Sequence, residues 1–196
     1  MHGIVYDPFR DRLWIGTGDT AQESKLFYTD DDFATVNVLG QGDQGWRIVG
    51  LIVTKDALFW GSDGEPDRAN IYRYDFATRE RRRIQHVGNQ VWFATQLADG
   101  TMVVASCYEP FIPYTAENSP PKEAALWISR DGGAWFKSVT FPYRPEIKVG
   151  MNAVLGLSHA NTHCAELYVS PFGPIDKSLT VQRYEVHWHA GSAPTL

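Results

Sequence analysis

Short apolar runs separated by polar turns recur along the chain, and one kind of run returns at a nearly constant interval. A turn followed by an aromatic and β-branched run that ends in small residues occurs at positions 11–17, 56–62 and 99–106. Gly61 follows Gly16 by 45 positions, and Ala105 follows Gly61 by 44. A fixed period of this length is typical of proteins built from repeated supersecondary units. The pattern therefore predicts a repeat architecture.

Each repeat contains several short runs whose composition favours β-strands. The predicted strands of the first two repeats are 3–6, 13–17, 25–28, 35–39, 46–54, 58–62, 71–74 and 81–86. Those of the third repeat and of a fainter fourth are 91–96, 101–106, 126–129, 135–140, 153–158, 166–170 and 180–186. The fourth repeat has no convincing fourth strand. No segment has the 3.6-residue apolar period of a helix.

Antiparallel four-stranded sheets repeated at this spacing are the pattern of β-propeller blades. We predict an all-β, propeller-like domain over residues 1–196, with blades at about 3–39, 46–86, 91–140 and 151–187. A simple β-sandwich is the alternative, but it does not explain the constant period. Four blades lie at the lower limit for closing a ring. We therefore expect either a part of a larger propeller or a chain whose open ends are covered by another copy.

Composition narrows the classes of partner. The chain has 196 residues, 43% of them hydrophobic, and a formal net charge of −5. No apolar run approaches the roughly 20 residues that a membrane-spanning helix needs, so we expect no membrane partner. A negative net charge makes nucleic acid a poor partner. The two cysteines, Cys107 and Cys164, do not make a disulfide framework. The N-terminus has no signal-peptide pattern, which favours a cytoplasmic protein unless the chain is truncated there.

One turn carries a recognisable motif, between the third and fourth strands of the third repeat. The segment Ser129-Arg130-Asp131-Gly132-Gly133-Ala134-Trp135-Phe136 resembles the Asp-box, or BNR repeat, of sialidase-like propellers. Ser129, Asp131 and Gly133 match that motif. The equivalent turn of the first repeat, residues 29–36, keeps Thr29 and the central aspartate but lacks the glycine, and the second repeat keeps only Asp75. A hydroxyl and a carboxylate here hydrogen-bond nearby backbone amides, so their role is structural.

The resemblance implies a class that includes glycosidases, lyases and carbohydrate-binding proteins. The arginines and the tyrosine–glutamate pair of sialidases are not recognisable, and the nearest string is Trp46-Arg47-Ile48-Val49. We therefore expect a glycoside hydrolase or lyase acting on a glycan or another small polar ligand at the channel mouth. The alternative is a non-catalytic propeller that binds carbohydrate or protein.

Propellers bind ligands at the mouth of the central channel, where the first strands begin and the second strands end. The residues predicted to be catalytic are Asp19, Arg47 and Asp63. Those predicted to bind substrate are His2, Trp46, Trp92, Tyr108, Glu109 and Asn152. Together they provide carboxylates, a guanidinium and an imidazole, which suit general acid–base chemistry.

Alternatives stay open for several of these residues. Asp19 follows a glycine and Asp63 precedes one, so both also suit simple turns, and His2 lies close to the terminus. A histidine and cysteine cluster at residues 159–164 has the wrong local structure for a zinc site with helical spacing. The sequence contains no phosphate-binding loop, dinucleotide fingerprint or nucleophile elbow. We expect no cofactor and no metal.

Overall fold

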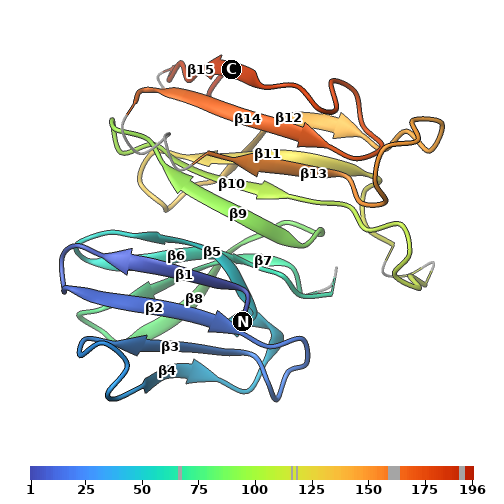
Figure 1. The fold of residues 1–196 in the computed structure, drawn as a ribbon. Coiled ribbons are helices and arrows are strands. Elements are labelled where there is room, and N and C mark those ends of the chain that lie inside the picture. The colour runs from blue at the N-terminus through green and yellow to red at the C-terminus, as the bar shows by residue number, and fades with distance from the viewer. Residues whose placement is uncertain (66–67, 116, 118, 159–163, 190–192) are drawn as a thin grey trace.

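The computed structural model describes residues 1–65, 68–115, 117, 119–158, 164–189 and 193–196, which form antiparallel sheets (Figure 1). Sheet 1 contains β1 (Gly3–Asp7), β2 (Arg12–Thr17), β3 (Lys25–Thr29) and β4 (Asn37–Gln41). Sheet 2 contains β5 (Ile48–Val53), β6 (Ala57–Ser62), β7 (Asn70–Asp75) and β8 (Glu80–His86). Sheet 3 contains β9 (Val91–Gln96), β10 (Met102–Ser106), β11 (Glu123–Ser129) and β12 (Phe136–Pro142). Sheet 4 contains β13 (Val154–Leu157), β14 (Glu166–Phe172) and β15 (Gln182–Glu185).

Each sheet is a simple meander in which consecutive strands pair, as the repeat pattern predicts. The first strands β1, β5, β9 and β13 lie next to one another in the middle of the molecule, and sheets 1 and 4 lie at opposite ends of the stack (Figure 1). Sheet 4 has three strands in the part of the chain that the structure describes, in agreement with the weak signal for a fourth strand there. No helix among the described residues has the length and apolarity to cross a bilayer.

Apolar side chains fill the spaces between consecutive sheets in three clusters. Trp14 and Leu26 of sheet 1 pack against Leu58 and Trp60 of sheet 2. Phe59 from the opposite face of β6 packs against sheet 3. A third cluster joins sheets 3 and 4. Because strand side chains alternate between the two faces of a sheet, each central sheet contributes to two clusters, so every sheet is held by its neighbours.

Glycines let the first two sheets approach closely. A Cβ atom added at Gly3 would overlap the backbone carbonyl oxygen of Val49, and one added at Gly16 would overlap that of Ile48. Gly16 occupies the position that repeats along the sequence, in the middle of the contact between sheets 1 and 2. The small residue at the end of the repeated run is therefore a packing requirement.

The turns that resemble Asp-boxes have the local structure expected of them. The amide of Gly132 donates to Ser129 Oγ at 2.8 Å, and the amide of Gly133 donates to Asp131 Oδ1 at 2.8 Å. In sheet 1, the amides of Phe33 and Thr35 donate to Thr29 Oγ1 at 3.1 Å and to Asp31 Oδ1 at 2.8 Å. Both turns connect the third strand of a sheet to the fourth. The hydroxyl and the carboxylate thus act on the backbone, as the sequence predicts.

One predicted strand begins later than expected. The run 46–54 was expected to be extended throughout, but β5 starts at Ile48. Residues Gln44–Trp46 form a single 3-10 turn, and the side chain of Asp43 caps it by accepting from the amide of Gly45 at 2.8 Å. This turn changes the direction of the chain just before β5, which affects the orientation of Trp46 and Arg47.

Candidate functional site

Seven side chains from four sheets lie at one end of the first strands. His2, Arg47, Trp92 and Asn152 are at or near the starts of β1, β5, β9 and β13, while Asp19, Asp63 and Glu109 follow β2, β6 and β10. In an antiparallel meander the start of the first strand and the end of the second lie at the same edge of the sheet. The repeat therefore places these residues around one mouth, which we call the mouth cluster.

Arg47 and His2 connect two carboxylates within the mouth cluster. Arg47 Nη2 lies 3.0 Å from Asp63 Oδ2 and 3.3 Å from Asp19 Oδ1. His2 Nε2 lies 3.1 Å from Asp19 Oδ1, and His2 Nδ1 lies 3.9 Å from Asp63 Oδ2. Arg47 and His2 thus each lie between the same two carboxylates, and the four residues come from sheets 1 and 2.

Asp63 is the buried member of this network. Its side chain is 8% exposed, compared with 76% for Asp19. Trp92 Nε1 donates to Asp63 Oδ1 at 2.8 Å, and the amide of Asp63 donates to the carbonyl oxygen of Arg47 at 2.9 Å. Burial raises the pKa of Asp63, and the charge of Arg47 opposes that rise. Both carboxylate oxygens of Asp63 therefore already have protein partners.

Glu109 occupies the opposite side of the mouth with fewer partners. Asn152 Nδ2 donates to Glu109 Oε1 at 3.1 Å. An isolated bridge between Tyr108 and Ala153 joins the segment after β10 to the start of sheet 4 and so brings these two residues together. Burial, followed by the negative charge of Asp63, raises the pKa of Glu109. Glu109 is thus a half-buried carboxyl group held by a single amide.

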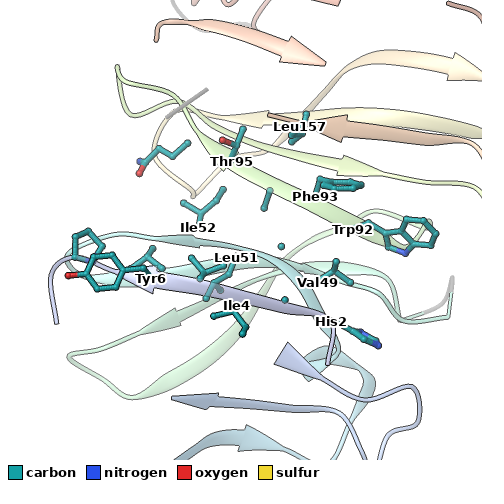
Figure 2. A pocket seen from close by; sticks show the side chains of 17 residues that line it. His2, Ile4, Tyr6, Val49, Leu51, Ile52, Trp92, Phe93, Thr95 and Leu157 are labelled. Carbon is teal, nitrogen blue, oxygen red and sulfur yellow. The ribbon is translucent and has the colours of Figure 1, made fainter. Parts of the chain in front are cut away.

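A groove runs from the mouth along the first strands. It has a volume of about 620 Å³ and is lined by residues of β1, β5 and β9 together with Leu157 of β13. Figure 2 shows His2 and Trp92 at one end of the groove and Tyr6 at the other, with Leu51, Ile52 and Phe93 between them. The groove has the size of a small-molecule site, and two members of the mouth cluster, His2 and Trp92, line one end of it.

The structure does not bring two of the predicted residues to the mouth. Trp46 is buried, stacks on Trp60 with ring centroids 5.3 Å apart, and is covered by the guanidinium of Arg81. Its ring points into the core because the 3-10 turn rotates the chain before β5. Tyr108 has its backbone near the mouth, but its ring is buried against Tyr143 with centroids 5.1 Å apart. Both rings therefore belong to the core.

Two residues near the mouth were not predicted from the sequence. Gln44 is buried and donates from Nε2 to the carbonyl oxygen of Asp19 at 3.2 Å, while its Oε1 has no hydrogen-bond partner. Cys107 is buried one residue past the end of β10, and burial raises the pKa of its thiol well above the usual value. In the sequence, Gln44 is marked only by its place in the polar loop before β5, and Cys107 only by its place directly after β10.

The described residues include no group of three histidine, cysteine, aspartate or glutamate side chains placed to hold a metal ion. The cluster noted at residues 159–164 lies outside the described residues except for Cys164, which is half-buried, forms no disulfide with Cys107 and donates from Sγ to the carbonyl oxygen of Glu166 at 3.1 Å.

No protein-family model matches the chain, and no curated protein shows significant similarity to it. Several solved structures are similar to it in fold. A candidate 6-phosphogluconolactonase from Bacteroides fragilis matches with a TM-score of 0.56 and 12% identity, over 90% of this chain and 48% of that one. A candidate gluconolactonase matches with a TM-score of 0.53 and 14% identity, over 97% of this chain and 64% of that one. A GH74 enzyme from Niastella koreensis matches with a TM-score of 0.51 and 16% identity, over 92% of this chain and 29% of that one.

The chain folds as a partial β-propeller. The four sheets are its blades, and the chain spans between 29% and 64% of the length of these three structures. Identities of 12–16% establish a shared fold.

The mouth cluster combines groups that can move protons with groups that can stabilise charge. A carboxyl group whose pKa is raised by burial keeps its proton to a higher pH than an ordinary carboxyl group, which suits a general acid. An imidazole hydrogen-bonded to a carboxylate can accept a proton, and a guanidinium can stabilise a negative charge that develops in a reaction. All three kinds of group are present within the same mouth, from residues far apart in the sequence.

Proposed function

We propose that this propeller hydrolyses a bond of a carbohydrate-derived substrate at the mouth cluster. The observation that carries the proposal is the grouping of His2, Arg47, Asp63 and Glu109 at one end of the first strands, where His2 also lines a groove of about 620 Å³. Similar folds in candidate lactonases and in a GH74 enzyme support the same class of chemistry. The resemblance of the turns to Asp-boxes also favours a sialidase-like, carbohydrate-active propeller.

Glu109 is the proposed general acid. Its pKa is raised, and Asn152 is bonded only to Oε1, which leaves Oε2 to protonate a leaving oxygen. The proposed base is His2, because Asp19 holds His2 Nε2 and the buried Nδ1 has no hydrogen-bond partner. Nδ1 is therefore the ring nitrogen left to accept a proton in this proposal.

Asp63 and Arg47 then have supporting roles. Asp63 accepts from Trp92 and pairs with Arg47, so its two oxygens are engaged and it is a positioning residue. Arg47 is the proposed stabiliser of negative charge on the substrate. This assignment differs from the expectation based on sequence, which made Asp63 a catalytic carboxylate and gave Glu109 only a binding role.

A second function, carbohydrate binding without turnover, is favoured by one observation. The ion pairs of Asp63 and Arg47 are complete without a ligand, as in a purely structural network. In that case the mouth would hold a sugar through Trp92 and the exposed Asp19, with no proton transfer.

An assay of hydrolysis with matched variants tests the proposal. The substrates are a panel of nitrophenyl glycosides and a panel of sugar lactones, which separate glycosidase from lactonase activity. We expect turnover of one panel by the native protein and a loss of about 10²–10⁴-fold in Glu109→Gln. Glu146→Gln, in an exposed loop between β12 and β13, is the control and retains activity.

Calorimetric titration of the same compounds distinguishes the two functions. Binding without turnover of either panel would establish the second function. Turnover that persists in Glu109→Gln would exclude the assigned acid. Absence of both binding and turnover would overturn both functions.

A further inference from the structure

The outer face of blade 1 carries an apolar row across the whole sheet. Ile4 pairs with Ile15, Ile15 pairs with Phe27, and Phe27 pairs with Val38. Ile4 and Val38, at the two ends of this row, are 46% and 47% exposed. Tyr6, also on this face, is exposed as well. We call this surface the blade 1 outer face.

The same positions in the other blades are covered by the preceding blade. Ile15 in the middle of the row is itself only 7% exposed, and Trp60, at its repeat position in β6, is fully buried against blade 1. In blade 3, Val104 at that position is fully buried against blade 2. In blade 4, Val169 of β14 is fully buried against blade 3. The blade 1 outer face therefore has the character of a surface that packs against another sheet.

The outer face of blade 4, at the other end of the stack, is different in character. Arg183 Nη1 lies 3.0 Å from Glu166 Oε1, and the hydroxyl of Tyr168 donates to Glu166 Oε2 at 2.6 Å. Arg183 also lies 3.6 Å from Glu185. A polar outer face with its own ion pairs is typical of a terminal repeat that faces water. The two ends of the stack thus differ: the blade 1 outer face carries an apolar row across four strands, whereas the blade 4 outer face carries ion pairs together with the exposed ring of Phe172.

We propose that the blade 1 outer face binds the same face of a second copy of this chain. Packing blade 1 of one copy against blade 4 of the next would cover an apolar row with charged groups and remove those groups from water, which is unfavourable. A two-fold interface instead brings the same apolar surface together from both copies. Two sheets can pack face to face in this way at about 10 Å.

The proposed interface also completes the surroundings of the mouth. A hollow of about 430 Å³ lies between the mouth cluster and the blade 1 outer face, with His2 and Asp19 on one side and Lys25 and Phe27 on the other. Phe27 belongs to the apolar row. A second copy seated on that row would therefore form a wall beside Asp19, the most exposed carboxylate of the mouth cluster.

The size of the face sets the expected strength of the dimer. Four strands of about five residues cover on the order of 300 Å² in projection, given the spacing of strands and residues in a sheet. Stable interfaces bury about 800 Å² per partner. The area of this face is smaller than that of stable interfaces, so the association should be weak and the two copies should exchange rapidly.

Sedimentation velocity of the native chain between about 1 and 300 μM tests the proposal. We expect a shift from monomer to dimer over this range and a monomer at every concentration for Val38→Lys. Because Val38 is already half exposed, the variant is expected to fold, and circular dichroism checks this. Ile4→Lys at the other end of the row provides a second variant.

Phe172→Lys is the matched control, since Phe172 lies on the outer face of blade 4 with 46% exposure. It should dimerise like the native chain. A native chain that stays monomeric throughout the range would overturn the proposal. Loss of the dimer in Phe172→Lys, or a dimer that persists in both Val38→Lys and Ile4→Lys, would also overturn it, because each places the interface elsewhere.

Discussion

Asp63 and Glu109 lie at the same mouth, and burial raises the pKa of both, yet their surroundings separate their roles. Asp63 accepts from Trp92 and pairs with Arg47. Glu109 has only the amide of Asn152 and is further disfavoured as an anion by the charge of Asp63. A carboxylate with two strong donors is stabilised in its charged form, whereas one with a single neutral donor is not.

Glu109→Gln should make the protein more stable at pH 7. The raised pKa means that the folded state holds the proton of Glu109 more tightly than the unfolded state. That contribution to stability is present below the ordinary glutamate pKa and is lost as the pH rises through the raised value. Glutamine has no charge to bury and can still accept from Asn152. Because Glu109 is half exposed, we expect a gain of less than about 1 kcal/mol at pH 7.

Urea unfolding at pH 7 and at pH 4 measures this effect. The difference between native protein and variant should shrink at the lower pH, where the native carboxyl group is protonated in both states. Glu146→Gln should show no such dependence on pH. An equal difference in stability at both pH values would mean that burial of charge at Glu109 has no influence on folding.

At the scale of single residues, the repeat predicted which backbone positions lie at this end of the first strands, but not which way each side chain points. His2, Asp19, Asp63 and Asn152 were predicted from their place in the repeat, and the structure brings them together with Arg47. Trp46 precedes Arg47 directly, yet its ring lies in the core. The 3-10 turn of Gln44–Trp46 decides this, and three residues carry too little periodicity to be predicted from sequence.

The turns between third and fourth strands join neighbouring blades as well as strands. Gly132 has φ of +76°, and a Cβ atom added to it would overlap the ring of Phe59 in blade 2. Gly42, which follows β4, has φ of +100° and nothing within 4 Å of an added Cβ. The first glycine is needed for backbone conformation and for space, and the second for conformation alone.

Gly132→Ala should therefore destabilise the protein more than Gly42→Ala. Both alanines would occupy the left-handed region, which is unfavourable by about 1–2 kcal/mol. The overlap with Phe59 adds an overpacking penalty of about 1–3 kcal/mol at Gly132 alone. Thermal unfolding of the two variants measures the difference. Equal melting temperatures would contradict the close contact between this turn and blade 2.

At the scale of elements, the alternation of apolar runs and turns predicted the strands of all four blades and their consecutive pairing. The sequence also showed that blade 4 lacks a clear fourth strand. The loops around the mouth were harder to predict, because their course depends on contacts between blades. The bridge between Tyr108 and Ala153 is one such contact, and it brings Glu109 beside Asn152.

Across the whole molecule, blades contact their neighbours in the stack, so stability should vary with position. Blades 2 and 3 are covered on both faces, whereas blades 1 and 4 each have one face without a neighbouring blade in this chain. In stacked repeats, terminal units open more readily than internal ones because they have one interface instead of two. The spacing of the repeat predicted the stacking, and the exposed faces became visible only in the structure.

Amide hydrogen exchange followed by mass spectrometry should reveal this gradient. The second strands β2, β6, β10 and β14 make a fair comparison, because each is bonded to strands on both sides. At low micromolar concentration we expect exchange in β6 and β10 to be at least about tenfold slower than in β2 and β14. Uniform protection of all four strands would show that the blades unfold as one cooperative unit.

The mouth cluster draws its first member from residue 2 and its last from residue 152. Ribosomes make the chain from its N-terminus, so His2 and Asp19 emerge long before their full set of neighbours exists. Arg47 and Asp63 can already pair when blade 2 has folded, whereas Glu109 gains Asn152 only when the start of blade 4 has emerged. During biosynthesis the pair of Arg47 and Asp63 would thus form before the pair of Glu109 and Asn152, and the proposed site would be complete only after blade 4 has docked.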